Sequence, residues 1–108
     1  MQKLITIILN DIEYSDTDSN KLLVKNIIKK IDNIEYIWSK VPNLIQKIKH
    51  TSGFISLSNS REAIKISFNT KTTSIELNEE FHTIVDSWAD KYKINLEYDW
   101  EKEIYYFI

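Results

Sequence analysis

The chain of 108 residues contains one glycine and one proline, and this scarcity constrains its fold more than any other feature. It leaves no room for a glycine-rich phosphate-binding loop, a disordered linker or a collagen-like tract. The chain also has no cysteine, which excludes disulfides, thiolate nucleophiles and cysteine-ligated zinc or iron–sulfur sites. At this length we expect a single domain over residues 1–108, with a core that can fold without covalent cross-links.

Apolar spacing in the first third of the chain predicts a strand, a polar loop and a helix. Lys3–Asn10 is rich in Ile, Leu and Thr, as is typical of a buried strand. Asp11–Asn20 is polar, and Asp18 or Ser19 can cap the following helix by accepting a hydrogen bond from its first turn. The apolar face of that amphipathic helix is formed by Val24, Ile27, Ile28 and Ile31.

Residues 34–38 are compatible with two structures, because their apolar side chains alternate as in a strand and also continue a helical stripe. Pro42 disfavours helical dihedral angles at Val41, whereas proline is well tolerated in the first turn of a helix. We therefore expect a short extended piece or a broken helix at 34–38, followed by a helix over roughly 42–49. Gly53 is expected to end this helix in a left-handed conformation.

The next segment predicts a hairpin followed by a third strand. Phe54–Ser58 and Glu62–Phe68 are two short strands on either side of a serine-containing turn. A second turn at 69–72 leads to a strand over Thr73–Leu77. The inward-pointing residues of that strand are expected to be Ile75 and Leu77.

A helix and a second hairpin are expected to complete the chain. Asn78 is a suitable N-cap, and Glu79 and Glu80 follow where the helix dipole favours negative charge. The buried face of this helix is formed by Phe81, Ile84, Val85, Trp88 and Tyr92. A tight turn then joins strands Lys93–Trp100 and Glu103–Ile108. Hairpins mixed with helices predict an α+β domain with a mainly antiparallel sheet and two to three helices packed on one face.

Charge is distributed unevenly along the chain, although its net value is only −2. Residues 21–75 hold ten lysines and arginines against three acidic residues, whereas residues 76–108 hold three lysines against nine acidic residues. The lysine-rich segment can track a phosphate backbone. The single arginine and the acidic pI favour a solvated face instead, so we expect no direct binding of nucleic acid.

The strand Lys93–Trp100 and the turn after it carry the clearest candidate for a functional surface. One face carries Asn95, Glu97, Asp99 and Glu101, and the other carries Ile94, Leu96, Tyr98 and Trp100. Carboxylates two residues apart on a strand lie about 6.6–6.8 Å apart on the same side. This face is either the solvated outside of a sheet or a surface that captures a basic partner through acidic and aromatic groups. The candidate partner-binding residues are Glu97, Asp99, Trp100, Glu101, Glu103 and Tyr105.

The remaining polar groups predict no metal site, cofactor or catalytic residue. The four carboxylates of Asp11–Asn20 can ligate a hard cation, but their spacing matches no EF-hand and better fits a capped, solvated loop. His50 and His82 are the only histidines, and without cysteine they form no recognisable zinc motif. No apolar run approaches the ~20 residues that span a bilayer, and no signal peptide is recognisable. We therefore expect a cytoplasmic protein that does not associate with membranes.

The C-terminal stretch Asn95–Ile108 combines acidic and aromatic residues, in a small chain without cysteine whose composition is typical of AT-rich genomes. In these features the chain resembles the single-domain bacterial immunity proteins that protect cells from colicins, contact-dependent growth inhibition toxins and related polymorphic toxins. The resemblance implies a non-catalytic, cytoplasmic protein without a cofactor that binds one cognate toxin domain. Such toxins are often nucleases with a basic active-site cleft, which the acidic, aromatic surface would cover.

Two alternatives from other classes stay open. A phage-encoded inhibitor of a host nuclease complex, such as an anti-CRISPR or antirestriction protein, would share the acidic face. A small metal-dependent enzyme would use the carboxylates of Asp11–Asp18, although no nucleophile elbow, glycine-rich loop or metal-ligand spacing supports this class. We expect a monomer rather than a homodimer, although the apolar segment Ile104–Ile108 suits pairing through a sheet edge as well as burial in a sheet.

Overall fold

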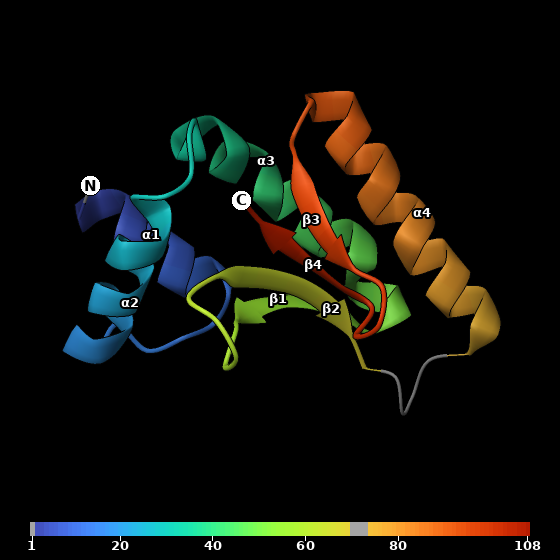
Figure 1. Ribbon diagram of the computed structural model, residues 1–108, viewed down its shortest axis with the longest axis horizontal. Coiled ribbons are helices and arrows are strands. Elements are labelled where there is room, and N and C mark those ends of the chain that lie inside the picture. The colour runs from blue at the N-terminus through green and yellow to red at the C-terminus, as the bar shows by residue number, and fades with distance from the viewer. Residues whose placement is uncertain (1, 70–73) are drawn as a thin grey trace.

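The computed structural model describes residues 2–69 and 74–108 of the chain. The helices follow in the order α1 (Gln2–Asp11), α2 (Asp18–Ile28), α3 (Ile34–Ile48), the short 3-10 helix η1 (Lys49–Thr51) and α4 (Ile75–Tyr92). The strands are β1 (Gly53–Leu57), β2 (Ile64–Phe68), β3 (Leu96–Asp99) and β4 (Ile104–Phe107). The expected α+β class and its antiparallel sheet are confirmed (Figure 1).

Two hairpins join into one four-stranded sheet. The strand order is β1-β2-β4-β3, and each neighbouring pair runs antiparallel. β1 pairs with β2 as predicted, and β3 pairs with β4 in a hairpin whose strands are shorter than expected. The two hairpins meet where Ile66 of β2 lies opposite Tyr105 of β4. This order leaves β1 and β3 at the two edges of the sheet.

One face of the sheet packs against α3 and α4 to form the core. The ring of Phe107 on β4 contacts Trp38 of α3 and Trp88 of α4, with centroid separations of 6.1 and 6.3 Å. Closer to the start of α4, Phe81 contacts Phe68 of β2 at 4.9 Å. Figure 1 shows α1 and α2 beside each other at one end of the molecule, with α4 at the other end. The predicted apolar face around α2 is buried and consists of Val24, Ile27, Ile28 and Ile31.

The prediction of a strand over Lys3–Asn10 is wrong, because these residues form most of α1. The buried side chains of α1 and of the residue after it are Ile5, Ile8, Leu9 and Ile12, which follow helical spacing. A short apolar run in a sequence is compatible with a strand or a helix. Packing against α2 and α3 stabilises the helix here. Thr17, rather than Asp18 or Ser19, caps α2 by accepting a hydrogen bond from the Asn20 N–H at 3.2 Å.

A single helix, α3, spans the segment in which we expected an extended piece or a break at 34–38. Pro42 lies inside this helix, where a proline costs about 3 kcal/mol because it lacks a backbone donor and crowds the preceding turn. The apolar face that offsets this cost is buried and consists of Ile37, Trp38, Val41, Leu44 and Ile48. The helix begins after Asn33, whose positive φ of 58° turns the chain into it.

The chain leaves η1 through Ser52, which adopts the left-handed conformation that we expected of Gly53. Gly53 instead begins β1, at a point where the sheet comes close to two helices. A Cβ atom at this position would lie 2.9 Å from the Ile48 Cβ and 2.9 Å from the Phe81 ring. Close packing, rather than backbone conformation, therefore requires the glycine.

We predicted a strand over Thr73–Leu77. Where the structure describes this segment, the prediction is wrong, because α4 begins at Ile75. Ser74 caps the helix by accepting a hydrogen bond from a backbone N–H in its first turn, and Asn78, the expected N-cap, lies inside the helix. Ile75 is 79% exposed instead of pointing inward. The rest of the expected strand and most of the turn at 69–72 lie outside the described residues. The predicted face of α4 is buried at Phe81, Val85 and Trp88 and partly buried at Ile84 and Tyr92.

Candidate functional site

The hairpin of β3 and β4 presents an exposed tryptophan among acidic residues. Trp100 lies in the turn between the two strands and is 74% exposed. Asp99 holds this turn, because its Oδ1 accepts hydrogen bonds from the N–H groups of Glu101 at 3.1 Å and Lys102 at 3.2 Å. Glu103 ends the turn with a positive φ of 56°. A turn fixed by its own side chain thus holds Trp100 in solvent.

Glu97 is an ion-paired carboxylate rather than a free one. Both of its oxygens accept hydrogen bonds from the guanidinium group of Arg61, at 3.3 and 3.2 Å. This interaction raises the pKa of Arg61, whose guanidinium also lies 4.4 Å from the ring centroid of Tyr106. The pair offsets the charge of Glu97, so the acidic face along β3 is weaker than the sequence alone indicates.

Tyr105 is buried between β4 and α4, which corrects its predicted place on a partner-binding surface. The residue is 5% exposed, and its hydroxyl donates a hydrogen bond to Asp86 Oδ1 at 3.0 Å. Because the phenolic hydrogen points to Asp86, the contact of 2.9 Å with His82 Nδ1 is donated by the histidine. Burial, reinforced by the charge of Asp86, raises the pKa of Tyr105. Tyr105 therefore anchors the hairpin to α4 and is not accessible to a partner.

Tyr98 and Glu103 lie at the border of this cluster. Tyr98 is 41% exposed, and its ring lies 5.6 Å from that of His82 and 4.6 Å from that of Tyr105. Partial burial, followed by the charge of Glu103, raises the pKa of Tyr98. Glu103 Oε1 lies 3.9 Å from His82 Nε2. The sequence analysis considered His82 only as a possible zinc ligand and did not predict that His82 and Asp86 contact Tyr105, because periodicity within α4 does not reveal which strand the helix meets.

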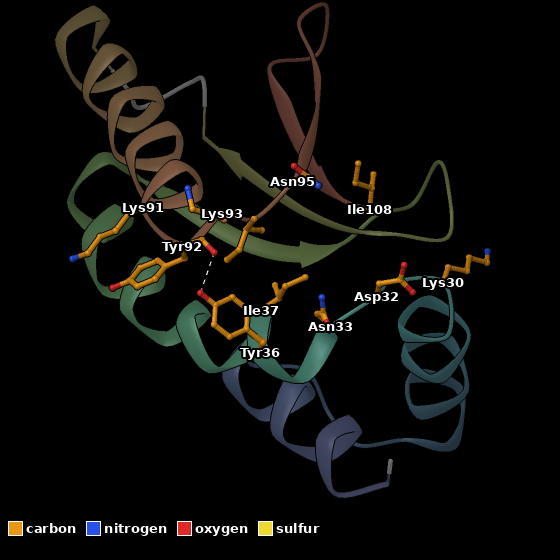
Figure 2. Close-up of a pocket in the computed structure, with 11 residues that line it drawn as sticks. Lys30, Asp32, Asn33, Tyr36, Ile37, Lys91, Tyr92, Lys93, Asn95 and Ile108 are labelled. Atoms are coloured by element: carbon orange, nitrogen blue, oxygen red, sulfur yellow. Dashed lines mark hydrogen bonds between the residues drawn. The ribbon is translucent and has the colours of Figure 1, made fainter.

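A cleft of about 740 Å³ lies at a different place, between the start of α3 and the end of α4 (Figure 2). Tyr36 lies in this cleft and donates a hydrogen bond to the Tyr92 carbonyl at 3.0 Å. At the margin, Lys91 lies 5.3 Å from the centroid of the Tyr92 ring, and Lys30 pairs with Glu62 at 2.6 Å. These groups are engaged within the protein, and among the described residues the cleft lacks an exposed aromatic side chain surrounded mainly by charges of one sign, as the hairpin has.

The acidic loop after α1 does not bring its carboxylates together. Within residues 2–69 and 74–108, no group of three His, Cys, Asp or Glu side chains is placed to hold a metal ion. Asp11 instead accepts a hydrogen bond from Trp38 Nε1 at 2.8 Å, and His50 lies 2.8 Å from Glu80 at the surface. No helix in the described parts of the chain is long and apolar enough to cross a membrane.

No protein-family model, curated protein or solved structure matches this chain. The candidate site is therefore interpreted from its own geometry. That geometry pairs Glu97 with Arg61 and buries Tyr105. The predicted binding residues that remain in or beside the turn of the hairpin are Asp99, Trp100, Glu101 and Glu103.

Proposed function

We propose that this protein is an immunity protein, which binds a cognate toxin domain and neutralises it without catalysis. The observation that carries the proposal is the 74% exposure of Trp100 on a turn surrounded by carboxylates. A partner that covers an exposed tryptophan buries a large apolar surface, and the rigid side chain loses little conformational entropy. Tryptophan residues therefore often contribute most of the binding energy of an interface. The tip of the hairpin is therefore the part of the surface that best fits a protein partner.

The charge around Trp100 indicates the kind of partner. Asp99, Glu101 and Glu103 flank it against the single cation Lys102 in this turn. The segment 76–108 as a whole carries nine acidic residues against three lysines. Acidic surfaces of this kind accelerate association with basic partners and disfavour acidic ones. A nuclease domain, whose cleft must attract nucleic acid, has the complementary charge.

Inhibition in this proposal is steric and electrostatic. Trp100 would fill an apolar part of the toxin surface, and Glu101 and Glu103 would pair with lysines or arginines that otherwise contact phosphate. Tyr105 would contribute only indirectly, because it holds the hairpin on α4 through Asp86. The protein would need no cofactor and would act as a monomer in the cytoplasm, without contacting nucleic acid or a membrane.

The proposal is tested by capturing partners on the immobilised protein from a lysate of its own organism, at low and at high salt. We expect one basic nuclease domain to be retained in stoichiometric amount and to be released by salt. Titration calorimetry with that domain should then show weaker binding for Trp100→Ala and Glu101→Lys. Glu101 is a better choice than Glu97 or Asp99, because its side chain forms no hydrogen bond or ion pair within the described residues.

Matched controls come from the far end of the molecule. Leu22→Ala removes another exposed apolar side chain, and Asp16→Lys reverses another exposed acid. Both controls should leave binding and thermal stability unchanged. Equal weakening by Asp16→Lys and Glu101→Lys would contradict a defined surface at the hairpin. Recovery of a large CRISPR or restriction complex would favour the phage-encoded inhibitor instead.

A further inference from the structure

The register of the sheet determines which backbone groups of β3 point away from it. In the first hairpin, the Ser58 N–H donates to the Ala63 carbonyl, so the hydrogen-bonded pairs alternate from that position. Ile66 of β2 therefore directs its backbone groups toward Tyr105 of β4, and those of Tyr105 point back. The alternation then directs the N–H and C=O groups of Tyr98 away from β4.

The same alternation applies two residues earlier, so Leu96 and Tyr98 both present a donor and an acceptor along the free edge of β3. Within residues 2–69 and 74–108, no hydrogen bond to these backbone groups is formed across that edge. The opposite edge of the sheet differs, because the outward N–H of Leu57 on β1 donates to the Tyr14 hydroxyl at 3.2 Å. The edge of β3 is thus available to a further strand.

A groove of about 430 Å³ runs along this edge, between β3 and α4. Its wall on α4 carries Asp86 and Asp90, one helical turn apart, and Lys93 is its only cation among the described residues. On the other face of β3, Glu97 is exposed but paired with Arg61, and Asp99 is partly exposed, with its Oδ1 bound to the hairpin turn. A strand placed at this edge would therefore have carboxylates near its side chains on both faces.

We propose that the free edge of β3 binds an extended, lysine- or arginine-rich segment of the partner as an additional strand. This inference rests on the proposed function and specifies how the partner is held. Main-chain hydrogen bonds to Leu96 and Tyr98 supply pairing, and the carboxylates on both sides select basic side chains. Trp100 lies just beyond the end of β3. In this position it covers the part of the partner chain that continues past the added strand.

The first experiment uses a capped peptide of about eight alternating lysine and valine residues, which is long enough to cover β3. Amide hydrogen exchange is measured by NMR on the full chain, with the peptide at millimolar concentration and low ionic strength. We expect slower exchange at the amides of Leu96 and Tyr98, and no change at Ile55 on the opposite edge of the sheet. A peptide with glutamate in place of lysine should have no effect. Unchanged exchange at Leu96 and Tyr98, or slowing at Ile55 instead, would overturn the proposal.

A pair of variants separates backbone pairing from contact with the tyrosine ring. Tyr98→Ala and Tyr98→Pro both remove the ring, but only proline removes the outward N–H, and it leaves the bonds between β3 and β4 intact. We expect Tyr98→Pro to bind the peptide at least about fivefold more weakly than Tyr98→Ala, as for the loss of one hydrogen bond. Equal affinities of the two folded variants would overturn strand addition. If Tyr98→Pro does not fold, exchange in the unmodified protein decides alone.

The same exchange measurement on the captured toxin complex separates this inference from the proposed function. Protection of Leu96 and Tyr98 in that complex supports both. A complex that weakens with Trp100→Ala but leaves those two amides unprotected retains the function and removes strand addition. Peptide binding at β3 without any captured nuclease domain would retain the edge site and remove the immunity function.

Discussion

The two edge strands of the sheet have similar lengths and alternating patterns, but their surroundings differ. In β1, Ile55 is 6% exposed, and the Leu57 N–H that points away from the sheet is bound by Tyr14. In β3, Tyr98 is 41% exposed, and its outward N–H has no partner among the described residues. The protein's own chain thus binds the edge of β1 at Leu57 and buries it at Ile55, whereas the edge of β3 stays accessible within the described residues.

This difference depends on segments that are distant in the chain. The loop after α1 places Tyr14 beside β1, and Trp38 of α3 holds the end of α1 by donating a hydrogen bond to Asp11. At β3 the flanking carboxylates would repel a second copy of the same edge. Charge can therefore protect an edge strand from self-association and still leave it open to a basic partner.

The largest expected effect comes from removing the side chain that holds the cover of β1. Trp38 is 2% exposed, so Trp38→Ala should lower the free energy of unfolding by about 3–5 kcal/mol, as for other buried aromatic residues. Trp100→Ala, at the open end of β3, should change it by less than about 0.5 kcal/mol. Urea unfolding followed by circular dichroism measures both. Similar losses for the two tryptophans would contradict the distinction between a covered and an open edge.

A smaller effect is expected where β1 approaches the helices. Gly53→Ala places a Cβ 2.9 Å from Ile48 and Phe81, so the free energy of unfolding should fall by about 1–3 kcal/mol through overpacking. Ser56→Ala in the same strand is the control, because its buried Oγ has no hydrogen-bond partner in the described structure. That control should be neutral or slightly stabilising. Thermal unfolding compares the two, and a neutral Gly53→Ala would show that the close approach relaxes freely.

The tyrosine hydroxyl that binds the edge of β1 should contribute about 1 kcal/mol, because Tyr14→Phe leaves the Leu57 N–H without its partner. Tyr98→Phe at the open edge removes a hydroxyl that makes no hydrogen bond within the described residues, and it should have almost no effect. Amide hydrogen exchange measures the same contact directly, since the Leu57 amide should exchange faster in Tyr14→Phe. Unchanged exchange at Leu57 would show that the contact does not protect the edge.

The smallest effect concerns alkaline pH and the anchor of the open hairpin. The pKa of Tyr105 is raised by burial and by Asp86, so the folded state retains a proton that the unfolded chain loses near a pKa of about 10. Tyr105 contributes fully to the free energy of unfolding below that pH, and the contribution decreases as the pH rises above it. At a pH of about 10.5, the free energy of unfolding should be lower, by no more than about 1 kcal/mol, than in a chain whose Tyr105 binds its proton equally in both states. Urea unfolding at several pH values should show a shallower alkaline loss in Tyr105→Phe. An identical slope in the two proteins would assign the loss to other groups.

The sequence predicted those parts of the fold in which one face of one element is buried. The spacing of Val24, Ile27 and Ile28 located α2, and the apolar face of α4 was predicted correctly from Phe81 onward. The prediction was wrong for α1, where a short apolar segment fits the spacing of both a helix and a strand. It was also wrong for α3, where packing overrides the preference of Pro42 against the interior of a helix. Intrinsic secondary-structure propensities of about 1 kcal/mol or less per residue are outweighed by the free energy of burying several apolar side chains.

For the candidate site, the alternation along β3 and the acidic turn around Trp100 can be predicted from the sequence, because both depend on residues that are close together in the chain. The pairing of Arg61 with Glu97 and the burial of Tyr105 against α4 are visible only in the folded protein. The fold also determines that Tyr14 binds the edge of β1 while the edge of β3 stays open. The physical reason is that a periodic pattern records how a segment divides its faces, whereas ion pairs, edge contacts and burial between elements depend on which distant segments meet.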